Sequence, residues 1–151
     1  MRVRTRRPVT ATLLDLVFET VVVENHPKLC GDAVLRFRDR LRGRLEVALG
    51  LETAHEGVLA LLNKRMTTDD FARAAALLRR EGVDVRAFIL LRPPFLSEEE
   101  GVEWALRSVA FAFDAGVQCC SVVPVRAGNG KTDLTVALRE ALDRFPGPYG
   151  R

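Results

Sequence analysis

The chain has few cysteines and histidines and no long apolar run, and each shortage excludes a class of protein. Its 151 residues include three cysteines and two histidines. That is too few for the disulfide framework of a small secreted domain, and the spacing does not suit a zinc site. No apolar stretch approaches the ~20 residues that a membrane-spanning helix needs. Free thiols are typical of reducing compartments, so we expect a cytoplasmic protein that does not associate with a membrane.

The net positive charge comes from one end of the chain. Lysine and arginine number 23 against 20 acidic residues, and four of the 23 are Arg2, Arg4, Arg6 and Arg7. Without these four the remainder carries about one negative charge. The basic segment, residues 1–17, could contact RNA phosphate, act as a transit peptide, or be an unstructured terminus. The last is the simplest of the three, because termini are often disordered.

Apolar runs alternate with helical patterns along the rest of the chain. β-Branched or continuous apolar runs predict strands at 18–24, 44–52, 83–91 and 119–125. Helical periodicity predicts helices at 32–42, 53–65, 67–82, 97–115 and 133–145. Such alternation favours an α/β fold with a parallel sheet and right-handed crossovers. Functional residues are then expected at the carboxyl ends of the strands.

Charged residues stand at those strand ends. Glu24 and Glu52 each close an apolar strand, and Lys64 and Arg65 follow the short helix after the second strand. The two carboxylates could share a polar ligand, and the cations could hold a carboxylate or phosphate. Solvation of the strand ends and stabilisation of a helix terminus explain the same residues without any ligand. His55, at the start of the short helix, is expected to be exposed.

A second candidate site is the segment GNGKT, Gly128 to Thr132. It resembles the end of the phosphate-binding loop G-x-x-x-x-G-K-[ST], but Val125 stands where the first glycine belongs. Valine does not readily adopt the positive φ that this glycine supplies. Nucleotide binding through this loop is therefore the weaker alternative.

Several motifs in order resemble the later half of the radical SAM core barrel. They are VVVENHP, ALGLET followed by LLNKR, FILLRPPFLSEEE and SVVPVRAGNG. The nearest branch modifies tRNA and cofactors, and includes the radical SAM subunit of archaeosine synthase and oxygen-independent coproporphyrinogen oxidase. The likeness covers residues 18–130, while 1–17 and the predicted helix and tail at 131–151 match poorly. It implies strands three to six of a (βα)6 TIM-like barrel.

The resemblance also implies roles for individual residues. Glu24 would line an S-adenosylmethionine site, and Glu52 would face the ribose and methionine moieties. Lys64 would hold the methionine carboxylate. Val122 and Pro124 would pack apolar atoms against the adenine. Glu24-Asn25-His26-Pro27 departs from the Glu-Ser-Arg-Pro of the nearest relatives in that branch.

The cluster-binding loop C-x-x-x-C-x-x-C of that family is absent from this chain. Cys30, Cys119 and Cys120 do not replace three cysteines on one short loop, and Cys119 and Cys120 are expected to be reduced, buried and inert. A [4Fe–4S] cluster would thus not be held by this chain. We accordingly expect a truncated or frame-disrupted radical SAM protein that keeps part of the S-adenosylmethionine pocket. The resemblance is to a family of enzymes, but this chain alone would be inactive, so whether it is an enzyme is left open.

The sequence also allows other interpretations of partners and function. A partial parallel sheet exposes two edges, so we expect a partner that supplies the missing barrel half, or a homo-oligomer, or marginal solubility. A non-catalytic interaction or RNA-binding module that uses the arginine-rich start is the main alternative function.

Overall fold

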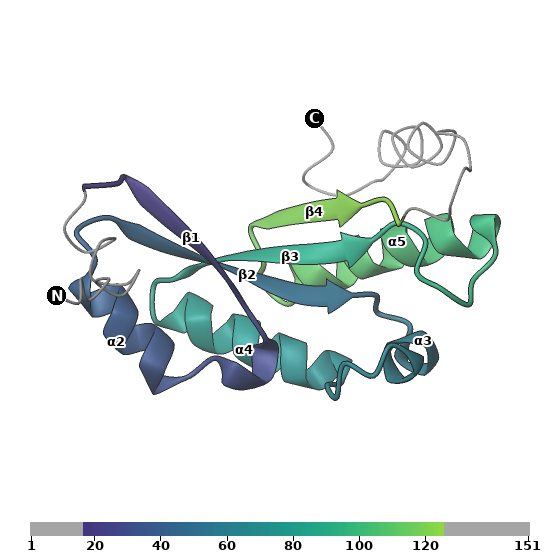
Figure 1. Cartoon of the computed structure of the whole chain (residues 1–151), viewed down its shortest axis with the longest axis horizontal. Coiled ribbons are helices and arrows are strands. Elements are labelled where there is room, and N and C mark those ends of the chain that lie inside the picture. The colour runs from purple at the N-terminus through teal and green to yellow at the C-terminus, as the bar shows by residue number, and fades with distance from the viewer. Residues whose placement is uncertain (1–16, 126–151) are drawn as a thin grey trace, which may run out of the picture.

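The computed structural model describes residues 17–125, which form a four-stranded parallel sheet flanked by helices (Figure 1). This confirms the predicted α/β class and the parallel sheet. The elements in chain order are β1 (Thr20–Asn25), the 3-10 helix η1 (Pro27–Leu29), α2 (Asp32–Arg40), β2 (Arg44–Glu52), α3 (Glu56–Leu61), α4 (Thr68–Arg80), β3 (Asp84–Leu90), α5 (Glu98–Asp114) and β4 (Cys119–Val123).

The strands lie in sequence order, and each pairs in parallel with the next. Side chains alternate between the two faces of a strand. One set, including Val47 and Leu49 of β2 and Val85 of β3, is fully buried against the apolar stripes of α4 and α5. The core of the described residues therefore lies between one face of the sheet and these helices.

The opposite face of the sheet is far less covered. It presents Val22 of β1, Ala48 of β2, Phe88 of β3 and Val123 of β4, and of these four only Ala48 is buried. Parallel sheets are ordinarily covered on both faces. We call this surface the bare face. Within residues 17–125 the sheet has two free edges, β1 and β4, and does not close into a barrel.

Helix boundaries follow the capping residues that the sequence offers. Thr67 and Asp70 form a capping box at the start of α4, and Ser97 and Glu100 form another at α5. Gly82, with φ of 72°, lies just beyond α4 and supplies the left-handed residue that ends many helices. The predicted stripe of α4 is buried as expected: Phe71, Ala74, Ala75 and Leu78.

Two of the predicted helices have other outcomes. The helix predicted at 53–65 is shorter, since α3 spans only Glu56–Leu61. The helix predicted at 133–145, the GNGKT segment and the arginines before residue 8 lie outside the described residues. No helix within 17–125 is long and apolar enough to cross a membrane.

Candidate functional site

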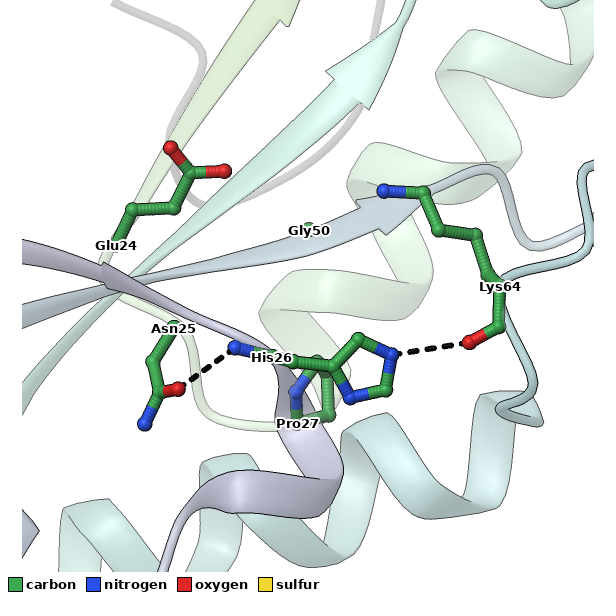
Figure 2. Close-up of a pocket in the computed structure, with 6 residues that line it drawn as sticks. All are labelled: Glu24, Asn25, His26, Pro27, Gly50 and Lys64. Carbon is green, nitrogen blue, oxygen red and sulfur yellow. Dashed lines mark hydrogen bonds between the residues drawn. The ribbon is translucent and has the colours of Figure 1, made fainter.

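A cavity of about 360 Å³ opens at the carboxyl ends of β1 and β2 (Figure 2). Its lining residues are Glu24, Asn25, His26, Pro27, Gly50 and Lys64. Glu24 and Lys64 extend from opposite sides of the cavity, one from β1 and the other from the loop after α3. This is the edge of a parallel sheet at which ligands are ordinarily bound.

The centre of the site is an ion pair. Lys64 Nζ lies 2.5 Å from Glu52 Oε1, and the side chain of Glu52 is 13% exposed against 39% for that of Lys64. A Cβ added at Gly50 would lie 2.8 Å from Glu52 Oε1 and 3.7 Å from Lys64 Nζ. The pair therefore rests over Gly50, where only a residue without a side chain leaves room for it.

The backbone on both sides of this ion pair is in the left-handed region. Glu52 has φ of 66°, and Asn63 and Arg65, which flank Lys64, have φ of 53° and 51°. A left-handed residue other than glycine costs roughly 1–2 kcal/mol. Such conformations gather where the surrounding structure requires a particular side-chain placement. Here they direct Lys64 toward the carboxylate at the end of β2.

His26 ties β1 to the same loop. Its Nδ1 accepts a hydrogen bond from the backbone N–H of Lys28 at 3.2 Å, so the ring proton resides on Nε2. Nε2 lies 2.9 Å from the carbonyl oxygen of Lys64 and donates to it. One imidazole thus caps η1 and fixes the segment that carries Lys64 (Figure 2).

The structure brings some of the predicted site residues together and separates others. Glu24 and Lys64 line the cavity, and Glu52 joins it through Lys64. Val122 packs against the helix-covered core, so its side chain is not part of the cavity, while Pro124 is exposed beyond β4. The roles that sequence assigned to these five residues in binding S-adenosylmethionine remain predictions.

Four residues that line the cavity, Asn25, His26, Pro27 and Gly50, were not among the predicted site residues. His26 was noted only as part of the segment Glu24-Asn25-His26-Pro27, although the His-Pro pair that starts η1 is a recognisable capping signal. Gly50 interrupts an apolar strand, which often marks a close approach by another group. Either signal could have pointed to this site.

Lys64 and Arg65 were also expected to stabilise the end of the short helix. The last turn of α3 contains no basic residue, because the helix ends before them. That alternative explanation is therefore wrong for both residues.

His55 and the cysteines differ from expectation. His55 is half-buried rather than exposed and caps α3 through Nδ1. Its ring packs against Trp104 with the centroids 4.4 Å apart and the ring planes tilted by 46°. Cys30, Cys119 and Cys120 are free and half-buried rather than buried. Burial raises the pKa of Cys30 to about 11 and that of Cys120 to about 12.

The site presents charged groups that can bind a polar ligand. It offers one ammonium, two carboxylates and an imidazole already engaged by backbone groups. Within residues 17–125, no three His, Cys, Asp or Glu side chains are placed to share a metal ion. A small molecule with both a carboxylate and an ammonium or hydroxyl donors matches this set of charges.

Comparisons with known proteins find relatives for part of the chain. No family model matches it. Archaeosine synthase subunit beta of Thermococcus kodakarensis is 35% identical over 113 residues, which are 72% of this chain and 35% of that protein. The subunit of the same name from Methanosarcina acetivorans is 34% identical over 82 residues, which are 51% of this chain and 24% of that protein. The chain thus spans about a third or less of the curated relatives it matches.

A solved structure shares the fold. Streptococcus suis SuiB superposes with a TM-score of 0.62 at 16% identity, over 90% of this chain and 32% of that one. At this identity the likeness concerns the fold alone.

These findings correct two predictions. The assignment to the radical SAM core is overturned, since no family model matches and the relatives are named as the beta subunit of archaeosine synthase. The function inferred from that assignment is therefore also wrong. It was that of a truncated radical SAM protein whose iron–sulfur half lies elsewhere. The alternative, an interaction or RNA-binding module, agrees better with these relatives.

Proposed function

We propose that this chain is a non-catalytic binding module of a tRNA-modification system of the archaeosine synthase kind. The names of its relatives support the link to that modification. In this role the chain holds a small amphoteric ligand at the carboxyl edge of its sheet and joins a larger assembly through the rest of the sheet.

The observation that carries the proposal is the preformed ion pair of Glu52 and Lys64. Three left-handed residues and one histidine maintain it at the carboxyl end of β2. A ligand carboxylate takes the place of Glu52 on Lys64, and the ligand ammonium is then received by the carboxylates of Glu52 and Glu24. Exchanging one charged partner for another avoids leaving any of these charges unpaired.

The sheet supports the proposed association. On its bare face, Val22 is 53% exposed to solvent and Val123 is 43% exposed. Both edge strands are free within residues 17–125. Such edges and faces favour further pairing or packing. We propose that the four strands are one part of a larger, barrel-like layer completed by a partner or by a second copy.

Calorimetric titration tests the ligand. The probes are methionine, S-adenosylmethionine, and 3-(methylthio)propionate, which keeps the carboxylate but has no ammonium. Lys64→Ala should weaken all three by about tenfold or more, the scale of a charge-assisted hydrogen bond. Glu24→Gln should weaken the two amino-acid probes and leave the propionate unchanged.

Lys28→Ala is the matched control, because Lys28 is paired to Asp70 and does not line the cavity. It should bind all probes as the unmodified chain does. Equal binding by Lys64→Ala and the unmodified chain would reject the site.

The association with RNA and with partners has separate tests. A tRNA transcript should bind with a steep dependence on salt, and deletion of residues 1–7 should flatten that dependence. Multi-angle light scattering should find a dimer or larger species. A stable monomer at micromolar concentration that does not bind tRNA would reject this part of the proposal.

A further inference from the structure

Charge is divided unevenly over the described residues. The segments 36–44 and 79–84 together contain seven arginines and three acidic residues, whereas the rest of residues 17–125 contains seven basic and thirteen acidic residues. A basic surface on an otherwise acidic body is typical of a protein that meets a polyanion. The seven arginines, which we call the arginine patch, are Arg36, Arg38, Arg40, Arg42, Arg44, Arg79 and Arg80.

The arginine patch lies at the amino end of the sheet, opposite the cavity. The helices α2 and α4 end there, and β2 and β3 begin there (Figure 1). Arg38 Nη1 donates a hydrogen bond to the carbonyl oxygen of Glu81, just beyond α4. Asp84, at the start of β3, lies 3.7 Å from Arg44 and 3.9 Å from Arg79. These contacts join the two arginine-bearing segments into one surface.

The loop between α2 and β2 is held in place by the backbone before β1. A Cβ added at Gly43 would lie 2.0 Å from the carbonyl oxygen of Phe18, so the two backbones are in close contact. The backbone N–H of Arg44 donates to the carbonyl oxygen of Glu19 at 2.9 Å. Arg42 therefore extends from a fixed backbone, and a ligand that binds it pays little to order the loop.

The fold itself accounts for only part of the arginine patch. Basic residues in the last turns of α2 and α4 stabilise the helix ends, and Arg44 pairs with Asp84. Arg36 and Arg42 do neither: both are exposed, and their side chains make no hydrogen bond or ion pair within residues 17–125. Arg36 also lies one turn before Arg40, and like charges at that spacing repel. The two arginines thus remain free for a ligand.

The chemistry of the arginine patch matches phosphate. Every basic residue in it is arginine, whose planar guanidinium can bind a phosphate group with two parallel hydrogen bonds. Binding of a basic helix to a membrane surface needs a free apolar face beside the charges. The apolar side of α2 is not free, because Val34, Phe37 and Leu41 pack against the core. A phosphate-bearing chain therefore fits this surface better than a lipid surface does.

We propose that the arginine patch binds the phosphate backbone of a folded RNA. The choice of RNA as the polyanion rests on the proposed function. The inference goes beyond that function because it places the RNA at the amino end of the sheet, on a surface separate from both the cavity and the arginine-rich start of the chain.

The test measures the affinity for a tRNA transcript between about 50 and 200 mM salt in the full chain. Arg36→Gln and Arg42→Gln should each reduce the slope of log affinity against log salt by roughly 1, and the double variant by roughly 2. An unrelated RNA hairpin should show the same decreases, because phosphate contacts carry no sequence information. Arg107→Gln is the matched control. It removes one exposed arginine of α5, paired with Glu103 and outside the arginine patch, and should leave the slope unchanged.

Several outcomes would overturn the inference. They are an unchanged slope in the double variant, an equal decrease in Arg107→Gln, and the absence of tRNA binding by the unmodified chain. Binding to phosphatidylserine vesicles that is stronger than binding to tRNA and is lost in the double variant would assign the surface to a membrane instead. Thermal unfolding should be the same for the double variant and the unmodified chain, since neither arginine has a partner in the fold.

A methionine titration separates this inference from the proposed function. The double variant should bind methionine as the unmodified chain does, because the arginine patch and the cavity lie at opposite ends of the sheet. If the unmodified chain binds no methionine but its tRNA binding depends on Arg36 and Arg42, the proposed amphoteric site is rejected and the arginine patch stands. Methionine binding without tRNA binding has the opposite meaning.

Discussion

The ammonium of Lys64 and the carboxylate of Glu52 meet at 2.5 Å directly over Gly50, so the absence of one side chain permits the contact between two others. The pair is drawn together by residues far apart in the chain. His26, from the end of β1, holds the carbonyl oxygen of Lys64, while Glu52 turns out of β2 with a left-handed backbone. Stability and ligand binding at this site should therefore respond differently to substitution.

Gly50→Ala should separate the two properties. The new Cβ would press on the carboxylate at the end of the flexible Glu52 side chain rather than on backbone. We expect the free energy of unfolding to change by less than about 1 kcal/mol, since this side chain can move aside. Ligand affinity should fall at least tenfold because the ion pair is displaced. Urea denaturation and calorimetric titration of the same preparation measure both, and unchanged affinity would contradict the placement of the ligand.

His26→Asn should separate the effects of the two hydrogen bonds that the imidazole makes. Asparagine caps helices well, so the bond to the backbone N–H of Lys28 is retained. Its side chain is too short to reach the carbonyl oxygen of Lys64. We expect the affinity for methionine to fall severalfold while hydrogen exchange at the Lys28 amide stays slow. Equal affinity would show that the loop carrying Lys64 needs no support from β1.

Much of the sheet could be predicted from the sequence because the strands are apolar runs bounded by clear turn and capping signals. The run 44–52 was placed to the residue, and the Ser97 and Glu100 capping box marked the start of α5. The end of α3 could not be predicted, since Asn63, Lys64 and Arg65 are acceptable in a helix. Only the tertiary contact of Lys64 with β2 makes their left-handed conformations favourable.

The site was predictable to the extent that it depends on strand ends. Glu24 and Glu52 were selected because each closes an apolar strand, and Lys64 because it follows the short helix after the second strand. That reasoning survives the loss of the family assignment. The sequence did not predict which β4 side chains face the core, because the residues on both faces of this strand are apolar. Val122 faces the core, and the exposed apolar residue is Val123.

Phe95→Gly should stabilise the protein. Phe95 has φ of 77° and is 67% exposed, so it carries left-handed strain and contributes little burial. Relief of roughly 1–2 kcal/mol of strain exceeds the entropic cost of about 0.5–1 kcal/mol that glycine adds. Leu29→Gly is the control, since Leu29 is 68% exposed without a positive φ, and it should destabilise. A lower melting temperature for Phe95→Gly would mean that the ring makes contacts that offset its strain.

Asp70 should make stability depend on pH in the acid range. A hydrogen bond from the backbone of Thr67, with support from Lys28 and Arg73, lowers the pKa of Asp70 from 3.8 to about 2. Because the folded pKa is depressed, the stabilisation is complete above pH 4 and is lost as the pH falls toward 2. Asp70→Asn should be less stable than the unmodified chain at pH 7 and should lose less stability between pH 4 and pH 2. Urea midpoints across this range measure the difference, with Asp69→Asn, an exposed neighbour outside the capping box, as the control.

Parallel pH profiles for Asp70→Asn and the unmodified chain would place the acid sensitivity in other carboxylates. Glu100 is the first candidate, because its hydrogen bond to the backbone of Ser97 also lowers its pKa.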